Sequence, residues 1–161
     1  MTGRIGILAY GSLIVDPGNE IGSLTIGRLN CVTPFAVEYA RLSKKRDYAP
    51  TLIPVATGGC PVNAVILLLK PETSLQVAKD ILWRRETRQD DLSRPYPEHK
   101  PPGEDSVRVE VIHNLAGVET VIYTSISRNI SVDTPAFSQI RQSNQYLNQP
   151  VKNNSTVFGI Y

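Results

Sequence analysis

The chain has 161 residues, and its 17 lysine and arginine residues nearly balance its 15 acidic residues. This length fits a single domain over residues 1–161, and a net charge near +2 does not favour binding to nucleic acid or to a membrane surface. No apolar stretch is long enough to cross a membrane, and the N-terminus does not resemble a secretory signal. We therefore expect a cytoplasmic protein, in which nothing favours a disulfide between Cys31 and Cys60.

The first half of the chain predicts four strands. They cover residues 4–10, 32–42, 51–55 and 62–70. The second of them alternates in its pattern as a strand does, whereas the fourth is β-branched and apolar throughout, as a strand buried on both faces would be. Between the strands, the glycine-rich residues 12–30 predict a loop, and Gly58-Gly59 predicts a turn.

A helix is expected in mid-chain. Thr73 is placed to cap its N-terminus, Gln76 would complete a capping box, and the helix would end near Asp90. A proline-rich exposed loop follows over residues 93–105. The remaining predicted elements are a β-hairpin over residues 107–112 and 120–127, a helix that starts at Asp133 or Thr134 with Pro135 in its first turn and ends near Leu147, and a short final strand over residues 156–161.

This order of elements predicts an α+β fold in which most of the structure is β. Several strands are apolar throughout, so both faces of their sheet must be covered. A small, mostly antiparallel β-barrel with flanking helices satisfies this requirement.

The mid-chain helix carries a carboxylate where its apolar face would continue. With residues placed at about 100° intervals, Glu86 projects from the same side as Ala78 and Leu82. Burial and a position near the C-terminal end of the helix both disfavour the charged form of this side chain, which suits a general base. The alternative is structural, with Glu86 paired to one of the neighbouring arginines, which are Arg84, Arg85 and Arg88.

A second feature is the Tyr10-Gly11-Ser12-Leu13 sequence at the end of the first predicted strand. Glycine lets the backbone approach a ligand closely, and successive unpaired N–H groups can hold a carboxylate or carbonyl oxygen. Such a turn alone is a weak signal, because ordinary turns share its composition.

Together, these motifs and their order resemble the γ-glutamyl cyclotransferase-like family. Four segments are each similar to a segment of that family: the Tyr10–Leu13 turn, the strand that contains Tyr39-Ala40-Arg41-Leu42, the Gly58-Gly59 turn before an apolar strand, and the helix that ends in Leu82-Trp83-Arg84-Arg85-Glu86. The hairpin from Val107 to Tyr123 and the late helix at Pro135 continue the same order. The resemblance therefore covers most of residues 5–147.

The resemblance implies a barrel with flanking helices and an enzyme that needs no metal or organic cofactor. Family enzymes cleave a γ-glutamyl amide by attack of the glutamyl α-amine on its own γ-carbonyl, which releases 5-oxoproline and an amine or amino acid. Carried over, Glu86 would be the catalytic base and acid. Tyr10, Gly11, Ser12 and Leu13 would bind the substrate, and glutathione is among the compatible γ-glutamyl substrates. Tyr123, in the predicted hairpin, would pack in the core or line the mouth of the barrel.

The sequence departs from the family pattern in places that concern the substrate. Thr87 follows the glutamate where family members often have glycine, and the next tyrosine is as far away as Tyr96. Phe137 stands where many members carry a tyrosine that contacts the ligand, and residues 93–103 form an altered, proline-rich segment. These departures support an alternative function, a non-catalytic module that binds a small amide or carboxylate ligand.

Other chemistries have less support in the sequence. Ser12 lies in no G-x-S-x-G elbow, and His99 and His113 have no evident orienting acid. A Cys60–His113 pair is conceivable, but Cys60 reads better as a structural thiol. The cysteines and histidines do not have the spacing of a metal site, and no nucleotide-binding motif is present.

Overall fold

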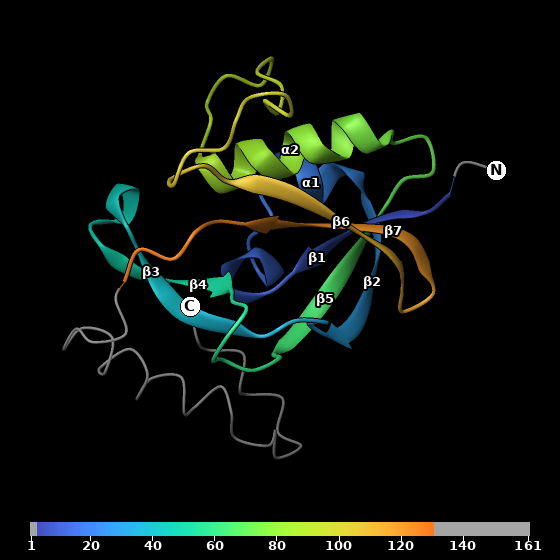
Figure 1. The fold of residues 1–161 in the computed structure, drawn as a ribbon. Helices are drawn as coiled ribbons and strands as arrows, with labels where there is room; N and C mark the ends of the chain where they lie inside the picture. Colours follow the sequence, from blue (N-terminus) through green and yellow to red (C-terminus); the bar gives the residue numbers. More distant parts are fainter. Residues whose placement is uncertain (1–2, 131–161) are drawn as a thin grey trace. The chain divides into compact units, whose positions relative to one another are not determined.

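The computed structural model describes residues 3–130 (Figure 1). Its elements in chain order are β1 (Ile5–Ala9), the 3₁₀ turn η1 (Gly11–Ile14), α1 (Asn19–Leu24), β2 (Thr25–Val32), β3 (Val37–Ser43), the 3₁₀ turn η2 (Lys44–Arg46), β4 (Ala49–Pro54), β5 (Asn63–Leu69), α2 (Leu75–Thr87), β6 (Arg108–Leu115) and β7 (Val118–Ser125). The chain forms two compact units. Of the described residues, the first contains residues 3–32 and Asn63–Ile126, and the second contains Thr33–Val62 and residues 127–130.

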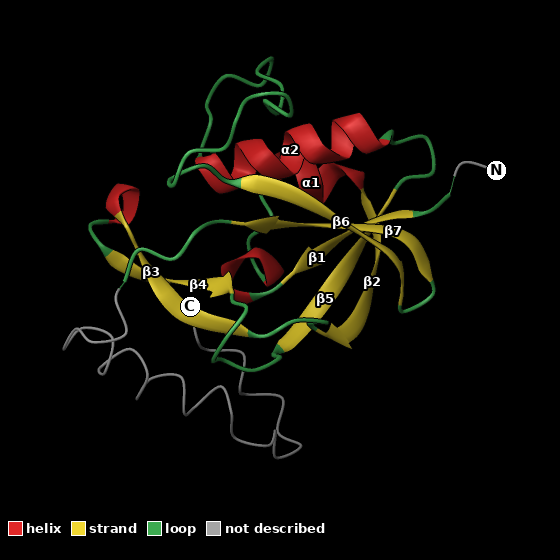
Figure 2. Ribbon diagram, viewed as in Figure 1, coloured by secondary structure: helices red, strands yellow, loops and turns green. Residues whose placement is uncertain are grey.

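The first unit is built on a five-stranded sheet with the order β2-β5-β1-β7-β6, drawn in yellow in Figure 2. Gly6 in β1 lies opposite Leu68 of antiparallel β5 and opposite Val121 of parallel β7. The other two pairings in this sheet, β2 with β5 and β6 with β7, are antiparallel. The predicted α+β fold with a mostly antiparallel sheet is therefore confirmed. Within residues 3–130, β2 and β6 are the sheet edges and are not paired with each other, so closure into a barrel stays a prediction.

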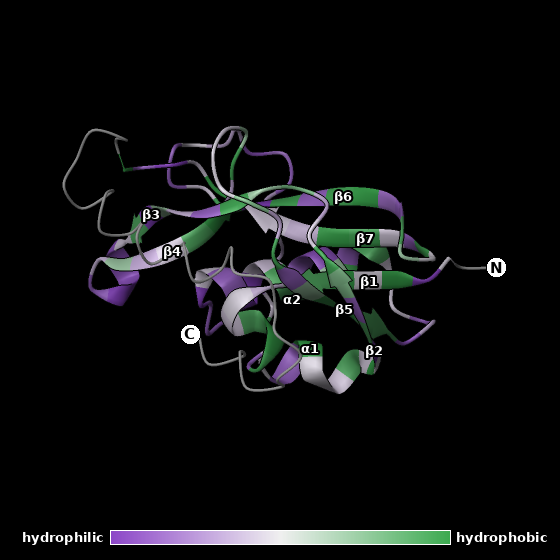
Figure 3. Ribbon diagram, turned by 90° about the horizontal axis from the view of Figure 1, so that it is seen from below, coloured by the Kyte–Doolittle hydropathy of each residue, from purple (hydrophilic) through white to green (hydrophobic). Residues whose placement is uncertain are grey.

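The sheet is buried on both faces. Helix α2 packs on one face, where apolar side chains of the strands and of the helix form one core: Ile7, Ala9, Leu67, Ile122, Ala78, Ile81 and Leu82. On the other face Leu8, Ile66 and Val121 are also buried. Figure 3 shows the hydrophobic colouring along β1, β6 and β7 that this burial requires. The all-apolar sequence of the strand predicted over residues 62–70 has the same cause.

The prediction that residues 12–30 form a loop is wrong, because this segment contains η1, α1 and β2. Strand β2 is an edge strand, with Ile26 and Val32 exposed and an irregularity in the pairing between Thr25 and Gly27. In β2 the apolar side chains occupy exposed as well as half-buried positions, so apolar and polar residues do not alternate as they do in a strand with one buried face. The irregular pairing shifts the pattern further. The sequence signal of this strand is therefore weak.

The second unit contains an antiparallel pair, β3 and β4, followed by the predicted turn at Gly58-Gly59, where both residues have positive φ. The strand predicted over residues 32–42 begins later, at Val37, because Val32 belongs to β2. Inside this unit the buried carboxylate of Glu38 lies 3.6 Å from Arg128 Nη2. A buried charge needs such a partner, so this pair stabilises the unit chiefly by avoiding an unpaired carboxylate.

The predicted hairpin over residues 107–112 and 120–127 is confirmed as β6 and β7, joined by a turn in which Ala116 and Gly117 have positive φ. The predicted proline-rich loop precedes it. Tyr96 fixes this loop to the sheet, because its hydroxyl accepts a hydrogen bond from the Val109 amide and its ring packs against Trp83. The late helix with Pro135 and Phe137 and the final strand over residues 156–161 lie outside the described residues. Among residues 3–130, no helix is both long enough and apolar enough to cross a membrane.

The N-terminal cap of α2 is Ser74 rather than the expected Thr73. The Ser74 side chain accepts a hydrogen bond from the Val77 amide at 3.2 Å, as an N-cap hydroxyl does. Thr73 Oγ1 is buried and has no hydrogen-bond partner among the described residues. Because Gln76 then occupies the second helical position, it cannot close a capping box, and it bonds to Asp80 instead. The helix ends at Thr87, three residues earlier than expected, because Arg88 adopts the left-handed conformation.

Two neighbouring substitutions test this cap. We expect Ser74→Ala to lower the free energy of unfolding by about 1 kcal/mol, because one helical N–H loses its acceptor. Thr73→Val is expected to leave that free energy unchanged or to raise it, since a buried hydroxyl without a partner is replaced by a methyl group of similar shape. Urea denaturation of both variants measures the difference, and a larger loss in Thr73→Val than in Ser74→Ala would contradict the assignment.

Candidate active site at the end of strand β1

The topology of the first unit brings three sequence-distant segments to one end of its sheet. Strand β5 runs antiparallel to β1 and ends beside the start of β1, where Gly6 lies opposite Leu68. After a short turn, α2 runs back along the sheet, so its last turn arrives at the end where β1 stops (Figure 1). Strand β7 is parallel to β1 and ends on the same side. The predicted site residues Tyr10, Glu86 and Tyr123 are therefore carried to the same end by three different elements.

The turn after β1 begins with a glycine in a left-handed conformation and two backbone amides. Gly11 has φ of 62° and open space on its Cβ side, so glycine is needed here for its conformation and not to avoid a clash. As the first residues of η1, Gly11 and Ser12 present their amides at its N-terminus, and neither amide donates a hydrogen bond to any residue that the structure describes. The Leu13 side chain is buried in the core and anchors the turn.

The phenol of Tyr10 reaches the end of β7. Its hydroxyl is 3.5 Å from the Thr124 carbonyl oxygen at the end of β7, as a long hydrogen bond. Burial raises the pKa of Tyr10 far above its ordinary value, and the negative charge of Glu86 and the nearby Tyr123 raise it further. Tyr10 therefore stays protonated and able to donate a hydrogen bond. Glu86 and Tyr123 are therefore near enough to the Tyr10 phenol to influence its pKa.

Glu86 is partly buried, as the helical pattern predicts, with 27% of its side chain exposed. The structural alternative also holds in part, because Arg85 Nη1 lies 3.4 Å from Glu86 Oε1. This ion pair is long and partly exposed, so it contributes little to stability. A carboxylate in this setting is partly accessible to solvent, lies near enough to the protonated Tyr10 phenol to influence it, and contacts the Arg85 guanidinium. These are properties of a group that can exchange a proton with a ligand.

The other two arginines of the helix end have different roles. Arg84 is buried and forms a two-point ion pair with Glu20 of α1, with N–O distances of 2.8 and 3.0 Å. Its third hydrogen bond goes to the Arg94 carbonyl in the loop after α2. Arg88 is exposed and caps the helix. The Glu20–Arg84 pair is not predicted by any sequence pattern, because Glu20 lies in the segment for which the sequence predicts a loop.

The residues that depart from the family pattern have structural partners here. Thr87 Oγ1 donates to the Trp83 carbonyl and accepts from the Gln89 side chain, so it closes the last turn of α2. Tyr96 is engaged with Val109 and Trp83, as described above. Tyr123 is half-buried in β7, and burial followed by the charge of Glu110 raises its pKa. Of the tyrosines in the first unit, Tyr10 and Tyr123 thus belong to the candidate site and Tyr96 to the packing of the loop.

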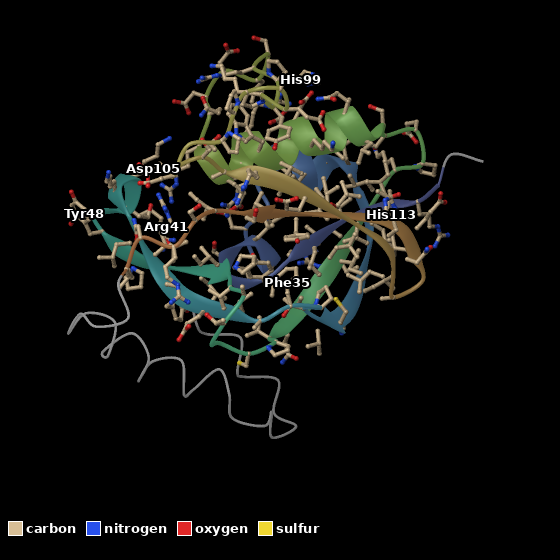
Figure 4. All side chains as sticks on the ribbon, in the orientation of Figure 1. Phe35, Arg41, Tyr48, His99, Asp105 and His113 are labelled. Carbon is tan, nitrogen blue, oxygen red and sulfur yellow. The ribbon has the colours of Figure 1, made fainter. Side chains whose placement is uncertain are left out.

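The competing nucleophiles have no comparable setting. His99 lies in the loop after α2, and His113 lies on β6 near the hairpin turn; both are exposed (Figure 4). Burial and the charge of Glu38 raise the pKa of the Cys60 thiol, which disfavours the reactive thiolate. Both cysteines are free thiols. Among residues 3–130, no group of three or more His, Cys, Asp or Glu side chains is placed to hold a metal ion.

The raised pKa of Tyr10 predicts a loss of stability in alkali. Above the ordinary tyrosine pKa of 10.0 the unfolded chain releases this proton while the folded chain keeps it, so the stability that is fully present below that pH falls as the pH rises. One such group gives a slope of at most about 1.4 kcal/mol per pH unit. We expect Tyr10→Phe to show a smaller loss of unfolding free energy between about pH 8 and about pH 11 than the wild type in urea titrations. Equal slopes would argue against a buried phenol at Tyr10.

Comparisons of the chain with models of known families, with curated proteins and with solved structures gave no match.

Proposed function

We propose that the protein is a γ-glutamyl cyclotransferase-like enzyme that cleaves a γ-glutamyl amide to 5-oxoproline and an amine or amino acid. The observation that supports this most is the meeting of a partly exposed carboxylate, Glu86, with a protonated phenol, Tyr10, beside the turn whose Gly11 and Ser12 amides have no partner within the described residues. The order of sequence motifs that resembles the family supports the same proposal. Closure of the sheet into a barrel and a cytoplasmic location are parts of it.

The reaction needs only groups of this kind. Glu86 accepts a proton from the α-ammonium group of the substrate, and the freed amine attacks the γ-carbonyl carbon, which forms the new C–N bond of the five-membered ring. The developing oxyanion accepts hydrogen bonds from the Gly11 and Ser12 amides. The γ-amide C–N bond then breaks, its electrons stay on the leaving nitrogen, and Glu86 returns the first proton to that nitrogen. The ring nitrogen gives up its second proton as the lactam forms, and this proton also goes to the released amine, which departs as an ammonium ion. No redox partner or cofactor enters this balance.

In this scheme Tyr10 and Tyr123 bind and orient the folded substrate. A phenol that stays protonated donates a hydrogen bond to a carboxylate or carbonyl oxygen without bringing a charge into the site. The side chain of Leu13 holds the turn from below, and its part in substrate binding is through the backbone. The substrate is thus held by donors from the turn and by the two phenols, while its amine faces Glu86.

A non-catalytic ligand-binding module is the second candidate, and two observations favour it. Glu86 is already paired with Arg85, and Thr87 closes the helix end where family members often have glycine. The same turn amides and phenols would then bind a small amide or carboxylate, with Glu86 serving as a fixed acceptor. This candidate predicts binding without turnover.

The experiment that separates the two candidates measures product and binding together. The purified protein is incubated with glutathione and with several γ-glutamyl amino acids, and 5-oxoproline is followed by mass spectrometry. Release of 5-oxoproline together with the free amine in equal amounts supports the enzyme. Saturable binding of a γ-glutamyl compound by calorimetry, with no release from any of them, supports the module, and the absence of both rejects the two candidates.

A further inference from the structure

Arg85 joins the two halves of the candidate site. Its Nε and Nη2 atoms both donate to the carbonyl oxygen of Asp16, at 3.2 and 2.7 Å, while its Nη1 atom faces Glu86. Two N–H groups of one planar guanidinium on one acceptor fix the orientation of the whole group. The same side chain therefore contacts the segment after η1 and the carboxylate of α2.

The contact at Asp16 is connected with the turn that carries the proposed oxyanion donors. The amides of Val15 and Asp16 both donate to the Ser12 carbonyl, the latter at 3.0 Å. A guanidinium that holds Asp16 thus holds the last part of a compact turn that begins with Gly11 and Ser12. The stem of Arg85 also lies against Gly18, where a Cβ atom would be 3.6 Å from Cγ of the arginine.

A second arginine holds the same turn without contacting the carboxylate. Arg28 of β2 donates a hydrogen bond from Nη2 to the Ile14 carbonyl. Within residues 3–130, Arg28 thus contacts the turn without contacting Glu86, whereas Arg85 contacts both. This difference separates a structural effect on the turn from an electrostatic effect on the carboxylate.

We infer that Arg85 is a positioning residue of the candidate site, which fixes the Glu86 carboxylate relative to the Gly11–Ser12 amides and keeps that carboxylate ionised. The groups near Glu86 include Arg85 on its own helix, the Tyr10 phenol at the end of β1 and Tyr123 of β7, which also acts on Tyr10. The guanidinium of Arg85 is a positive charge in contact with this acid, and a positive charge favours the ionised carboxylate. Its role in turnover rests on the proposed function, whereas its role in geometry does not.

Four variants test the inference. Arg85→Met removes the charge and the two N–H donors to Asp16 but keeps an apolar stem. Arg85→Lys keeps the charge but not this pair of donors. Arg28→Met loosens the turn only, and Arg88→Met, at an exposed position of the same helix end, controls for net charge. Amide hydrogen exchange at Val15 and Asp16 reports the turn, and the pH profile of 5-oxoproline release reports the carboxylate.

We expect exchange at these two amides to become roughly tenfold faster in Arg85→Met, Arg85→Lys and Arg28→Met. The acidic limb of the pH profile should move to higher pH by roughly half a unit or more in Arg85→Met alone among the four variants, because it is the one that removes the Arg85 charge in contact with Glu86. Arg88→Met should match the wild type in both measurements. If exchange and pH profile of Arg85→Met equal those of the wild type, the inference is overturned.

The test remains decisive if the proposed function fails. A wild-type protein that releases no 5-oxoproline rejects the function, and the carboxylate is then followed directly by carbon NMR titration, with Glu86→Gln to assign the signal. An upward shift of the Glu86 titration in Arg85→Met but not in Arg85→Lys or Arg28→Met supports the positioning role, and equal titrations in all variants overturn it. If Arg85→Met does not fold, the comparison is made with Arg85→Lys and Arg28→Met. Faster exchange in Arg28→Met but not in Arg85→Lys would show that the paired N–H groups of Arg85 do not hold the turn, and the inference would be overturned.

Discussion

Replacing Glu86 by glutamine is expected to lower the rate of 5-oxoproline release by roughly 10²- to 10⁴-fold, which is the usual contribution of a positioned general acid–base. The amide side chain has nearly the same size, so packing at the end of α2 is kept. It cannot accept a proton from the substrate ammonium group or return one to the leaving amine. The loss should therefore appear in kcat, with a smaller effect on KM.

The matched control for this substitution is Glu72→Gln. Glu72 is exposed and precedes the other end of the same helix, so its replacement changes the net charge equally without touching the candidate site. We expect Glu72→Gln to keep wild-type kcat and both variants to unfold at the wild-type temperature within about 2 °C. Release by Glu86→Gln at a rate close to that of the wild type would show that another group exchanges the proton.

The largest expected effect on stability is that of Leu82→Ala. Leu82 is fully buried between α2 and the sheet, where it belongs to the same core as Ile7, Leu67 and Ile122. Removing three of its side-chain carbons loses their transfer free energy and leaves a cavity, because a sheet and a helix cannot close fully around the gap. We expect the free energy of unfolding to fall by about 2–5 kcal/mol, measured by urea denaturation.

Val77→Ala on the same helix is the control for the effect of alanine on helix propensity and for differences between protein preparations. Val77 is 43% exposed, so its truncation should change the free energy of unfolding by about 0.5 kcal/mol or less. A similar loss in the two variants would mean that α2 is not packed on the sheet by the face that carries Leu82. Leu82→Ala also provides a reference for the Glu86 variant, since the rate of 5-oxoproline release by Leu82→Ala shows how a folding defect affects activity.

The parts of the fold that were predicted correctly are those with a strong local pattern. Strand β5 is apolar at nearly every position because both faces of its sheet are buried, and the β6–β7 hairpin has a turn sequence between two alternating segments. The partly buried position of Glu86 also follows from helical spacing alone. In each case the signal lies within about 20 residues of sequence, the range over which a periodic pattern can be recognised.

The parts that were missed depend on contacts between distant segments. Strand β2 lies at the sheet edge, so its apolar residues face solvent as well as the core. Thr73 and Ser74 are both good caps by residue type, and only the position of the backbone decides between them. The choice of Arg85, among three arginines, as the partner of Glu86 depends on where the Asp16 carbonyl and Glu20 lie, and neither position is encoded near the helix.

The parallel pairing of β1 with β7 has a consequence for how the protein forms. Gly6 has Leu68 on one side and Val121 on the other, so the central strand of the sheet receives its second neighbour only from a segment made much later. Pairings over such sequence separations slow folding, because a large loop must close, at a cost in entropy, before the paired strands stabilise the chain. On the ribosome, chains that end before β7 would hold β1 with one open edge of apolar residues, and those unfinished chains are the forms most exposed to aggregation.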